Sequence, residues 1–284
     1  MVDIFGRTEV ETLRGKQGPR GIRGGIKDIC TWFPASTLSQ FQKHDEKACF
    51  LLKDLSTDIV KDGSKIKEWK SRSKANLNLK AILPSSTIAE HPVSLEFSKN
   101  RYNANFTLLE NRSGSGLIVL TFLTDSDENQ TLVGKWTSKD AFRQNFEISV
   151  TTSEIFISGY LKKRPMTHTI MHNCRNWTTF SLMYTVSRFK ECHFEYFING
   201  DLNENGNFSL DVPRISQPHM TMGCREDNTR YFSGKIHAFE IFFTEKSCDR
   251  IPDEIALMIA DSHKIKDLQP NQRQINFECN SDII

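Results

Sequence analysis

The 284-residue sequence lacks any apolar run long enough to cross a bilayer as a helix. Its longest strongly apolar stretch, LIVLTFL at 117–123, is far shorter than the roughly 20 residues that such a helix needs. The opening residues, MVDIFGRTEV, also lack the apolar segment of a secretory signal. We therefore expect no membrane span, and either a cytosolic protein or a product whose signal or anchor lies upstream.

A dominant charge is missing too. The 37 basic and 35 acidic residues give a formal net charge of +2. This balance predicts no strong overall attraction to nucleic acid or to anionic membranes. Basic residues do concentrate near the N-terminus, at Arg14, Lys16, Arg20, Arg23 and Lys27. We interpret this segment as a solvated tail, with contact to a polyanion as the functional alternative.

Apolar spacing of the helical kind is nearly absent from the middle of the chain. Apolar and polar residues alternate there in short runs, and turn signals recur roughly every 8 to 15 residues. The predicted strands after residue 92 include 93–97, FTLLE at 106–110, 117–124, 131–137, 146–150 and 155–161, the last two as a hairpin. Asn76, Asn78 and Pro84 favour short strands over a helix in the lysine-rich stretch 65–83. The pattern predicts an all-β fold, an antiparallel sandwich or jelly roll.

Two more strands are predicted in WTTFSLMYTVSRFKECHFEYFINGD at 177–201. Their apolar residues lie two positions apart, at Phe180, Leu182, Tyr184, Phe194, Tyr196 and Ile198. Such alternation is typical of strands with one buried face. Asn199 and Gly200 tolerate the positive φ of a tight hairpin turn, so a further strand is expected after Asp201.

The N-terminal segment LRGKQGPRGIRGG has a collagen-like period. Gly15, Gly18, Gly21 and Gly24 recur at every third residue, as a triple helix requires because only glycine fits at its axis. We interpret the run as the end of a longer collagenous stalk, which would make the protein a homotrimer. The alternative is a flexible glycine-rich tail whose period is accidental.

The chain has an odd number of cysteines, at 30, 49, 174, 192, 224, 248 and 279. At least one thiol is therefore free or paired between chains if the others form disulfides. Cys30 could pair between chains or with Cys49. Five glycosylation sequons, at Asn105, Asn111, Asn129, Asn176 and Asn207, are compatible with secretion.

Four segments resemble, in order and spacing, motifs of the laminin G-like, concanavalin A-like family of jelly rolls. They are Trp177 opening a strand, the turn at 196–200, MTMGCR at 220–225 and the strand 232–242. Tyr196 lies one place early for the family's Y-x-N-G turn, and Phe242 replaces a final tyrosine. IKEWKSRS, Pro84-Ser85 and VSLEFSKNRY resemble the N-terminal motifs of such modules more weakly. The resemblance covers roughly 70% of the chain and implies the fold, since this sandwich hosts many functions.

Structural roles are expected for three residues of these motifs. Trp177 is interpreted as a core tryptophan at a sheet edge. Gly223 and Gly234 are expected to satisfy backbone geometry that other residues adopt poorly.

The predicted organisation has four parts. Residues 1–28 form the basic collagen-like or disordered segment, 29–47 a junction, 48–248 the sandwich, and 249–284 a C-terminal helix and tail. The helix is predicted at 251–263, where Ile255, Met258 and Ile259 have helical spacing.

Catalytic carboxylates were sought because glycosidases with this fold use pairs of them. The sequence has no E-x-D-x-E run, and Glu195 and Glu240 lie in apolar strands without a second carboxylate two positions away. We therefore predict that the protein is not an enzyme.

Two acidic loops are candidate calcium sites. Asp201, Asn203 and Asn205 match the first half of a calcium loop, although Val212 stands where an EF-hand has glutamate. Asp125 and Asp127, with Glu128, form the second cluster. A solvated loop is the simpler interpretation of both, but many members of the family bind calcium at the sandwich rim. No other cofactor is expected.

A zinc site at His168, His172 and Cys174 is rejected. The segment THTIMHNC looks extended, and residues four apart in a strand lie about 13 Å apart, too far for one ion.

The sequence thus predicts a non-enzymatic extracellular recognition or matrix module. Its expected partner is a glycan, as for a lectin, or an extracellular matrix protein, bound by a collagen-linked trimer; disulfide bonds are expected as well. The alternatives are a glycan-cleaving enzyme on the same scaffold and an intracellular β-sandwich interaction protein.

Overall fold

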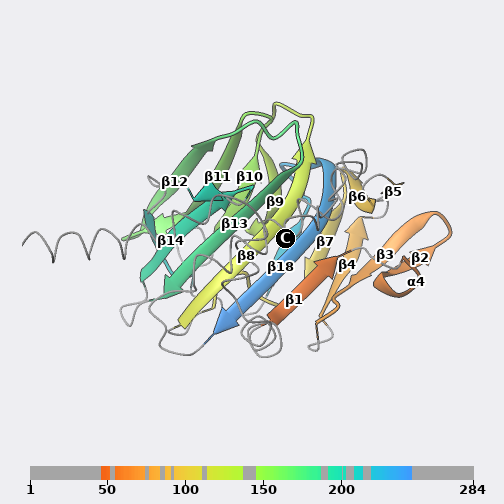
Figure 1. Cartoon of the computed structure of the whole chain (residues 1–284), viewed down its shortest axis with the longest axis horizontal. Helices are drawn as coiled ribbons and strands as arrows, with labels where there is room; N and C mark the ends of the chain where they lie inside the picture. Colours follow the sequence, from red (N-terminus) through yellow and green to blue (C-terminus); the bar gives the residue numbers. More distant parts are fainter. Residues whose placement is uncertain are drawn as a thin grey trace, which may run out of the picture.

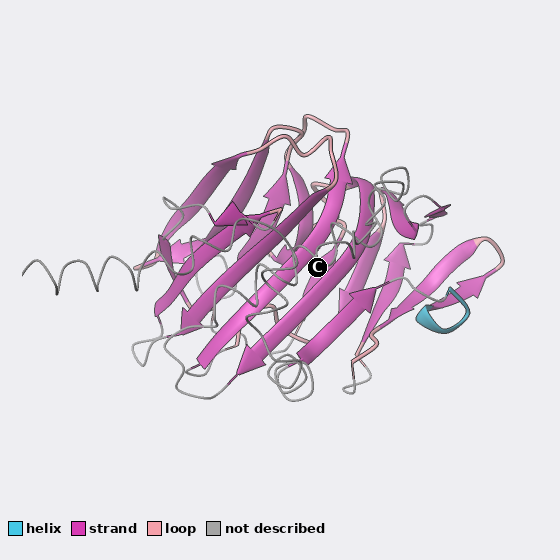
Figure 2. Cartoon of the chain, in the orientation of Figure 1, coloured by secondary structure: helices cyan, strands magenta, loops and turns pink. Residues whose placement is uncertain are grey.

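The computed structural model describes residues 46–51, 55–73, 77–83, 87–90, 93–110, 114–136, 145–186, 191–199, 201–202, 208–213 and 219–244. Nearly all regular structure in them is β-strand, with one short helix, α4 at Leu55–Asp58 (Figure 2). Two antiparallel sheets stack as a sandwich (Figure 1). The predicted all-β sandwich is therefore confirmed. No helix in the described ranges is long and apolar enough to cross a membrane.

Sheet A has the strand order β15-β14-β13-β8-β18-β6-β5, with β1 beside β18 and β16 beside β14. Its strands are β1 Glu46–Leu51, β5 Thr87–Glu90, β6 Val93–Ser98, β8 Gly114–Thr124, β13 Thr178–Val186, β14 Glu191–Ile198, β15 Asp201–Leu202, β16 Phe208–Asp211 and β18 Ser233–Thr244.

Sheet B has the order β12-β11-β10-β9-β17-β7-β4-β3-β2. Its strands are β2 Ile59–Asp62, β3 Lys65–Lys70, β4 Asn78–Leu83, β7 Arg101–Ala104, β9 Gln130–Lys135, β10 Phe146–Val150, β11 Glu154–Leu161, β12 Arg164–Met171 and β17 Met220–Met222. The predicted hairpin of 146–150 with 155–161 is β10 and β11.

The two strands predicted in 177–201 are confirmed as β13 and β14, which pair with each other. Its alternating residues face each other in the pairs Phe180–Ile198, Leu182–Tyr196 and Tyr184–Phe194. Cross-strand pairs of this kind stabilise a sheet by side-chain packing. Asn199 has a φ of 52°, Gly200 lies outside the described residues, and β15 begins at Asp201.

The core lies between the sheets and is rich in aromatic rings. Phe50 stacks on Phe239, with centroids 5.8 Å apart, and meets Trp69 edge-on at 5.6 Å. All three are fully buried. Each such side chain contributes about 1.5–3 kcal/mol by leaving water.

One predicted strand is wrong. FTLLE at 106–110 has no regular structure, although Phe106, Leu108 and Leu109 are buried in the core. The adjacent Leu108 and Leu109 are both buried, and no residue of 106–110 belongs to a strand of either sheet. The unpredicted helix α4 is tied down because Arg72 Nε donates to the buried Asp58 at 2.8 Å.

Several predicted features lie outside the described residues. They are the collagen-like glycines Gly15, Gly18, Gly21 and Gly24, the basic N-terminal segment, the helix at 251–263, Asn203, Asn205 and the side chain of Asp201.

Three cysteines are buried free thiols. Burial raises the pKa of Cys174 to about 12 and that of Cys224 to about 11, and raises the pKa of Cys192 well above its ordinary value. Cys174, Cys192 and Cys224 thus form no disulfide and resist thiolate chemistry.

Candidate functional site

Sheet B carries a polar row on the face that points away from sheet A. In β10, Phe146, Ile148 and Val150 join the core, which leaves Glu147 and Ser149 on the opposite, outer face. Residues paired across strands share a face. From β12 to β3 the register extends this row through Thr167, Ser158, Glu147, Gly134, Thr221, Asn103, Lys80 and Glu68.

A groove of about 380 Å³ opens on this face over β4 and β7. We call it the outer-face groove, and it is lined by Leu77, Asn78, Lys80, Ile82, Asn103, Ala104, Asn105, Phe106 and His219. Its side chains are three amides, a lysine, a histidine and a few apolar groups, including Ile82, which is 47% exposed. No carboxylate is among those lining residues that the structure describes. The lining can therefore donate and accept hydrogen bonds and cover an apolar surface.

Two buried polar atoms of the groove residues have no hydrogen-bond partner in the described part of the chain. They are Asn103 Oδ1 and His219 Nε2. Glu226 Oε1 lies 3.9 Å from His219 Nε2, too far for a hydrogen bond. Buried polar atoms are normally satisfied, so these two mark a place where water or a ligand would complete the hydrogen bonding. Neither atom is exposed to solvent, so the groove wall must shift slightly to admit it.

Burial lowers the pKa of His219, and Lys135 and Arg101 lower it further, against the opposing effect of Glu226. The imidazole is therefore predominantly neutral at physiological pH and offers one donor and one acceptor. Arg101 Nη1 also donates to the Glu226 carbonyl at 2.9 Å and to Asn228 Oδ1 at 2.6 Å. These bonds fix the loop at 223–232 beside the groove.

The same loop is anchored by a fully buried carboxylate, Glu147. Arg225 binds it with both arms, Nε to Oε1 at 2.9 Å and Nη2 to Oε2 at 2.6 Å. The Thr131 hydroxyl also donates to Oε1, and Arg230 Nη1 lies 3.7 Å from Oε2. Both oxygens of the buried carboxylate thus have a hydrogen-bond donor, and the ion pair organises the loop.

Aromatic rings flank this ion pair. The Arg225 guanidinium lies 4.5 Å from the centre of the Trp136 ring, a cation–π contact. Trp136 stacks against Tyr160 at 6.4 Å. The Arg225 side chain is fixed by its ion pair with Glu147 and by its contact with Trp136. It is therefore a structural residue and not a ligand-binding one.

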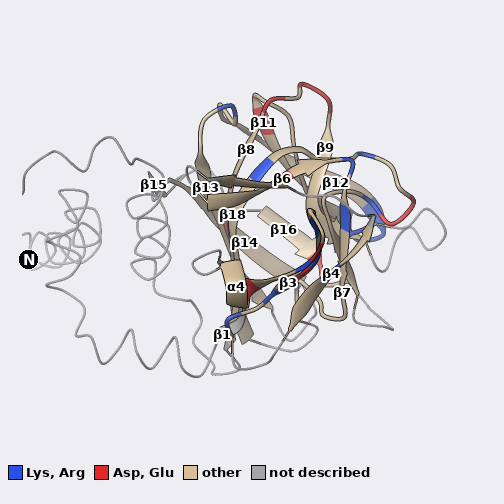
Figure 3. Ribbon diagram, turned by 90° about the vertical axis from the view of Figure 1, so that its right-hand side faces the viewer, with Lys and Arg blue, Asp and Glu red and all other residues tan. Residues whose placement is uncertain are grey.

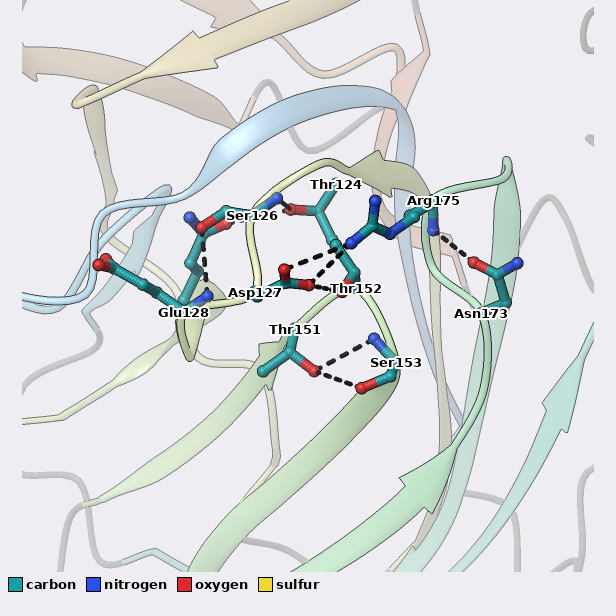
Figure 4. Close-up of polar contacts among 10 residues, drawn as sticks. Thr124, Ser126, Asp127, Glu128, Thr151, Thr152, Ser153, Asn173 and Arg175 are labelled. Carbon is teal, nitrogen blue, oxygen red and sulfur yellow. Dashed lines mark hydrogen bonds and ion pairs between the residues drawn. The ribbon is translucent and has the colours of Figure 1, made fainter.

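The acidic loop between β8 and β9 lies at one end of the sandwich, at the top of Figure 3. Asp127 accepts hydrogen bonds from Arg175 Nη2 at 3.1 and 3.3 Å and from the Thr152 hydroxyl (Figure 4). Thr152 and then Arg175 hold the pKa of Asp127 below its ordinary value. A calcium ion would have to displace Arg175 from this carboxylate, and Asp125 is simply exposed.

The histidines rejected as zinc ligands have other contacts. His168 stacks on Phe208 with centroids 4.3 Å apart, and His172 Nε2 lies 3.1 Å from the Thr178 hydroxyl. Within the described ranges no group of three or more His, Cys, Asp or Glu side chains is arranged to hold a metal.

The residues expected to have structural roles lie in or beside strands. Trp177 directly precedes β13, is partly buried and meets His237 edge-on at 6.4 Å. Gly223 follows β17 with a φ of 87°, and Gly234 in β18 has a φ of 150°.

Sequence reasoning did not identify the groove or the Glu147 network. The motif that ends in Arg225 was recognised, but its partner lies 78 residues away in FEISV. One signal was present: a glutamate between Phe146 and Ile148 in a strand whose every other position is apolar or small.

We expect stability to fall as the pH drops below the ordinary histidine pKa of about 6.5. Burial lowers the pKa values of His168, His172 and His219 in the folded protein. The unfolded chain therefore binds these protons more tightly, and protonation favours unfolding. The loss begins near the unfolded pKa and ends below the folded values. The urea midpoint should be lower at about pH 5.5 than at about pH 7.5.

His168→Phe is the matched variant for this effect. Phenylalanine keeps the stacking on Phe208 and removes one titrating group, so the two midpoints should move closer together. An equal or higher midpoint at the lower pH would show that the sign is wrong.

No family model and no curated protein matches the chain. Among solved structures it is similar to the receptor-binding domain of botulinum neurotoxin mosaic serotype C/D, with a TM-score of 0.52 and 11% identity over 79% of this chain and 52% of that one. A botulinum neurotoxin type C structure, reported with cell entry dependent on two ganglioside molecules, has a TM-score of 0.52 and 7% identity over 79% and 52%. The serotype D binding domain has a TM-score of 0.51 and 12% identity over 80% and 53%.

The chain spans about half the length of each of these structures. At such low identity the similarity is one of fold, a β-sandwich of the jelly-roll type. The similarity does not extend the binding properties of those proteins to this chain.

Proposed function

We propose that this protein is a non-enzymatic recognition module that binds a glycan in the outer-face groove. The observation that carries the proposal is the pair of buried, unpartnered atoms, Asn103 Oδ1 and His219 Nε2, in residues that line a polar groove. A sugar hydroxyl both donates and accepts, so it can satisfy an amide oxygen and a neutral imidazole together. Ile82, which is 47% exposed, offers an apolar surface to the C–H face of a sugar ring.

The lining chemistry favours binding over glycan cleavage. Retaining hydrolysis needs two carboxyl groups about 5 Å apart, and inversion needs a slightly wider pair. The groove lining has neither, and the nearby buried carboxylate Glu147 is committed to Arg225. One structural neighbour is named as a receptor-binding domain and another is reported with two ganglioside molecules, which agrees with a binding role.

A glycan array of the full chain, followed by titration of the best glycan, tests the proposal. Asn103→Ala should weaken binding about tenfold, because one hydrogen bond to a buried partner is worth about 1 kcal/mol or slightly more. Lys80→Ala should weaken it by a similar factor.

Asn173→Ala is the control, since this exposed amide lies on the rim loop after β12. Unchanged titrations in both groove variants would refute the groove as the site. Repeating the array with a chelator tests the calcium proposal at Asp125, Asp127, Asp201, Asn203 and Asn205, because only calcium-dependent binding would be lost.

We also propose an extracellular setting, membership of the laminin G-like group, and assembly as a homotrimer through the collagen-like segment at 15–24. The glycine period supports the trimer, and a trimer would add avidity to weak groove binding. Sedimentation analysis of the full chain tests it, since a monomer at all concentrations contradicts the assembly.

A further inference from the structure

The turn between β11 and β12 has an unusual sequence for its geometry. Leu161 pairs with Arg164, so only Lys162 and Lys163 form the loop. Their φ angles are 50° and 67°, both in the left-handed region. Two central residues with positive φ define a type I′ hairpin turn, which strongly favours Asn-Gly.

Lysine is a poor choice for such a turn, because its Cβ crowds the backbone at positive φ. The same chain uses the favourable sequence elsewhere, at Asn199-Gly200 after β14. Local strain that a simple substitution would relieve is often retained at functional positions. The turn therefore retains two positively charged side chains at the expense of folding stability.

The three basic side chains Lys162, Lys163 and Arg164 are exposed and consecutive. None of them has an ion-pair partner within the described ranges. Asp211 lies close, but its Oδ2 accepts from the backbone N–H of Lys163 at 3.4 Å and so anchors the turn. Pro165 follows, also exposed, on the edge strand β12.

Lysine and proline on an edge strand also protect against sheet-to-sheet aggregation. That role needs charges along the strand, and it gives no reason to place two lysines at strained turn positions. Among residues 161–164 only Leu161 is apolar, and it is partly exposed. The exposed Met166 lies two residues beyond Arg164 on β12, so the tip itself presents no large apolar group to a membrane.

We propose that the Lys162–Lys163–Arg164 tip is a binding site for a sulfated polysaccharide. A chain of closely spaced sulfates can meet three adjacent cations, with each contact made at the protein surface and weakened by salt. The tip lies at the β12 edge of sheet B, whereas the outer-face groove lies over β4 and β7 (Figure 1). This surface is thus separate from the proposed glycan groove and does not depend on it.

The test measures binding of the full chain to dextran sulfate at about 0.15 M salt, with neutral dextran as the uncharged polymer. Lys162→Gln/Lys163→Gln removes two charges and keeps the strained turn, so affinity should fall about 30-fold, at roughly fivefold per cation near an anionic surface. Lys162→Asn/Lys163→Gly should lose the same affinity and raise the Tm by about 4 °C, because the turn is relieved.

Lys99→Gly is the matched control. Lys99 is an exposed lysine with a φ of 58° in the turn between β6 and β7, on the opposite side of the molecule (Figure 1). Its replacement should raise the Tm by about 2 °C and leave dextran sulfate binding unchanged.

Two results would overturn the proposal. One is dextran sulfate binding that is unchanged in both tip variants. If Arg20→Gln/Arg23→Gln then abolishes that binding, the basic N-terminal segment is the binding site instead of the tip. The other is tip-dependent binding to phosphatidylserine vesicles with none to dextran sulfate, which would make the ligand a membrane. Loss of groove binding in Asn103→Ala would leave all of these readouts unaffected.

Discussion

Glu147→Gln should lower the free energy of unfolding by about 3–5 kcal/mol, the usual cost of removing one partner of a buried ion pair. The carboxylate is fully buried and holds Arg225 through bonds of 2.9 and 2.6 Å. Glutamine can accept one of them, but its NH₂ group then faces a second guanidinium donor. Arg225, with a side chain only 13% exposed, would keep its charge without compensation. Urea unfolding followed by circular dichroism measures the loss.

Two further variants separate the charge from the contact. Glu147→Leu/Arg225→Met removes both charges, so it should cost less than Glu147→Gln, because no unpaired ion remains in the interior. Glu226→Gln on the same loop is the exposed control and should change the free energy by about 0.5 kcal/mol or less. A Glu147→Gln midpoint equal to that of Glu226→Gln would contradict a structural role for the ion pair.

The strands that sequence reasoning predicted correctly are those in which one face is core. Phe180, Leu182 and Tyr184 alternate because successive side chains of a strand point to opposite faces, and these three belong to the face that joins the core, although the residues between them are also buried. The strand predicted at 106–110 is wrong, because burial alone produced its apolar pattern. Its apolar residues are buried without a strand partner, and an apolar run alone does not distinguish these cases.

The site was not predictable because it depends on strand order. β17 lies between β9 and β7, although more than 80 residues separate it from β9. That insertion brings Arg225 to Glu147 and His219 to Asn103. No local pattern encodes which strands become neighbours, so the polar residues of the outer face read as ordinary solvent-facing positions in sequence.

The Lys162-Lys163 turn could not be predicted from the sequence for a different reason. Its sequence contains no turn signal, and propensity predicts no hairpin there. The pairing of β11 with β12 over eight residue pairs imposes the turn on residues that disfavour it. Positions where tertiary structure overrides local preference are the ones most worth testing for function.

Gly234→Ala should abolish folding or cost at least about 3 kcal/mol, because neither the backbone nor the space accepts a Cβ. Gly234 lies in β18, between β6 and β8, with a φ of 150°. A Cβ there would lie 2.2 Å from the Leu123 carbonyl oxygen and 3.0 Å from Thr124 Cα, both backbone atoms of the central strand β8. Relief would need a shift of β18, whose register with β8 is the longest in sheet A. Soluble yield and the urea midpoint measure the effect.

Gly63→Ala is the matched control for that prediction. Gly63 also has a positive φ, 61°, but a Cβ at this position would meet no atom within 4 Å. It should therefore cost only the backbone penalty of about 1 kcal/mol. The difference between the two alanine variants measures the packing of β18 against β8, the contact on which the centre of sheet A depends. Equal midpoints would mean that β18 can move away from β8, and the register of these two strands would then be wrong.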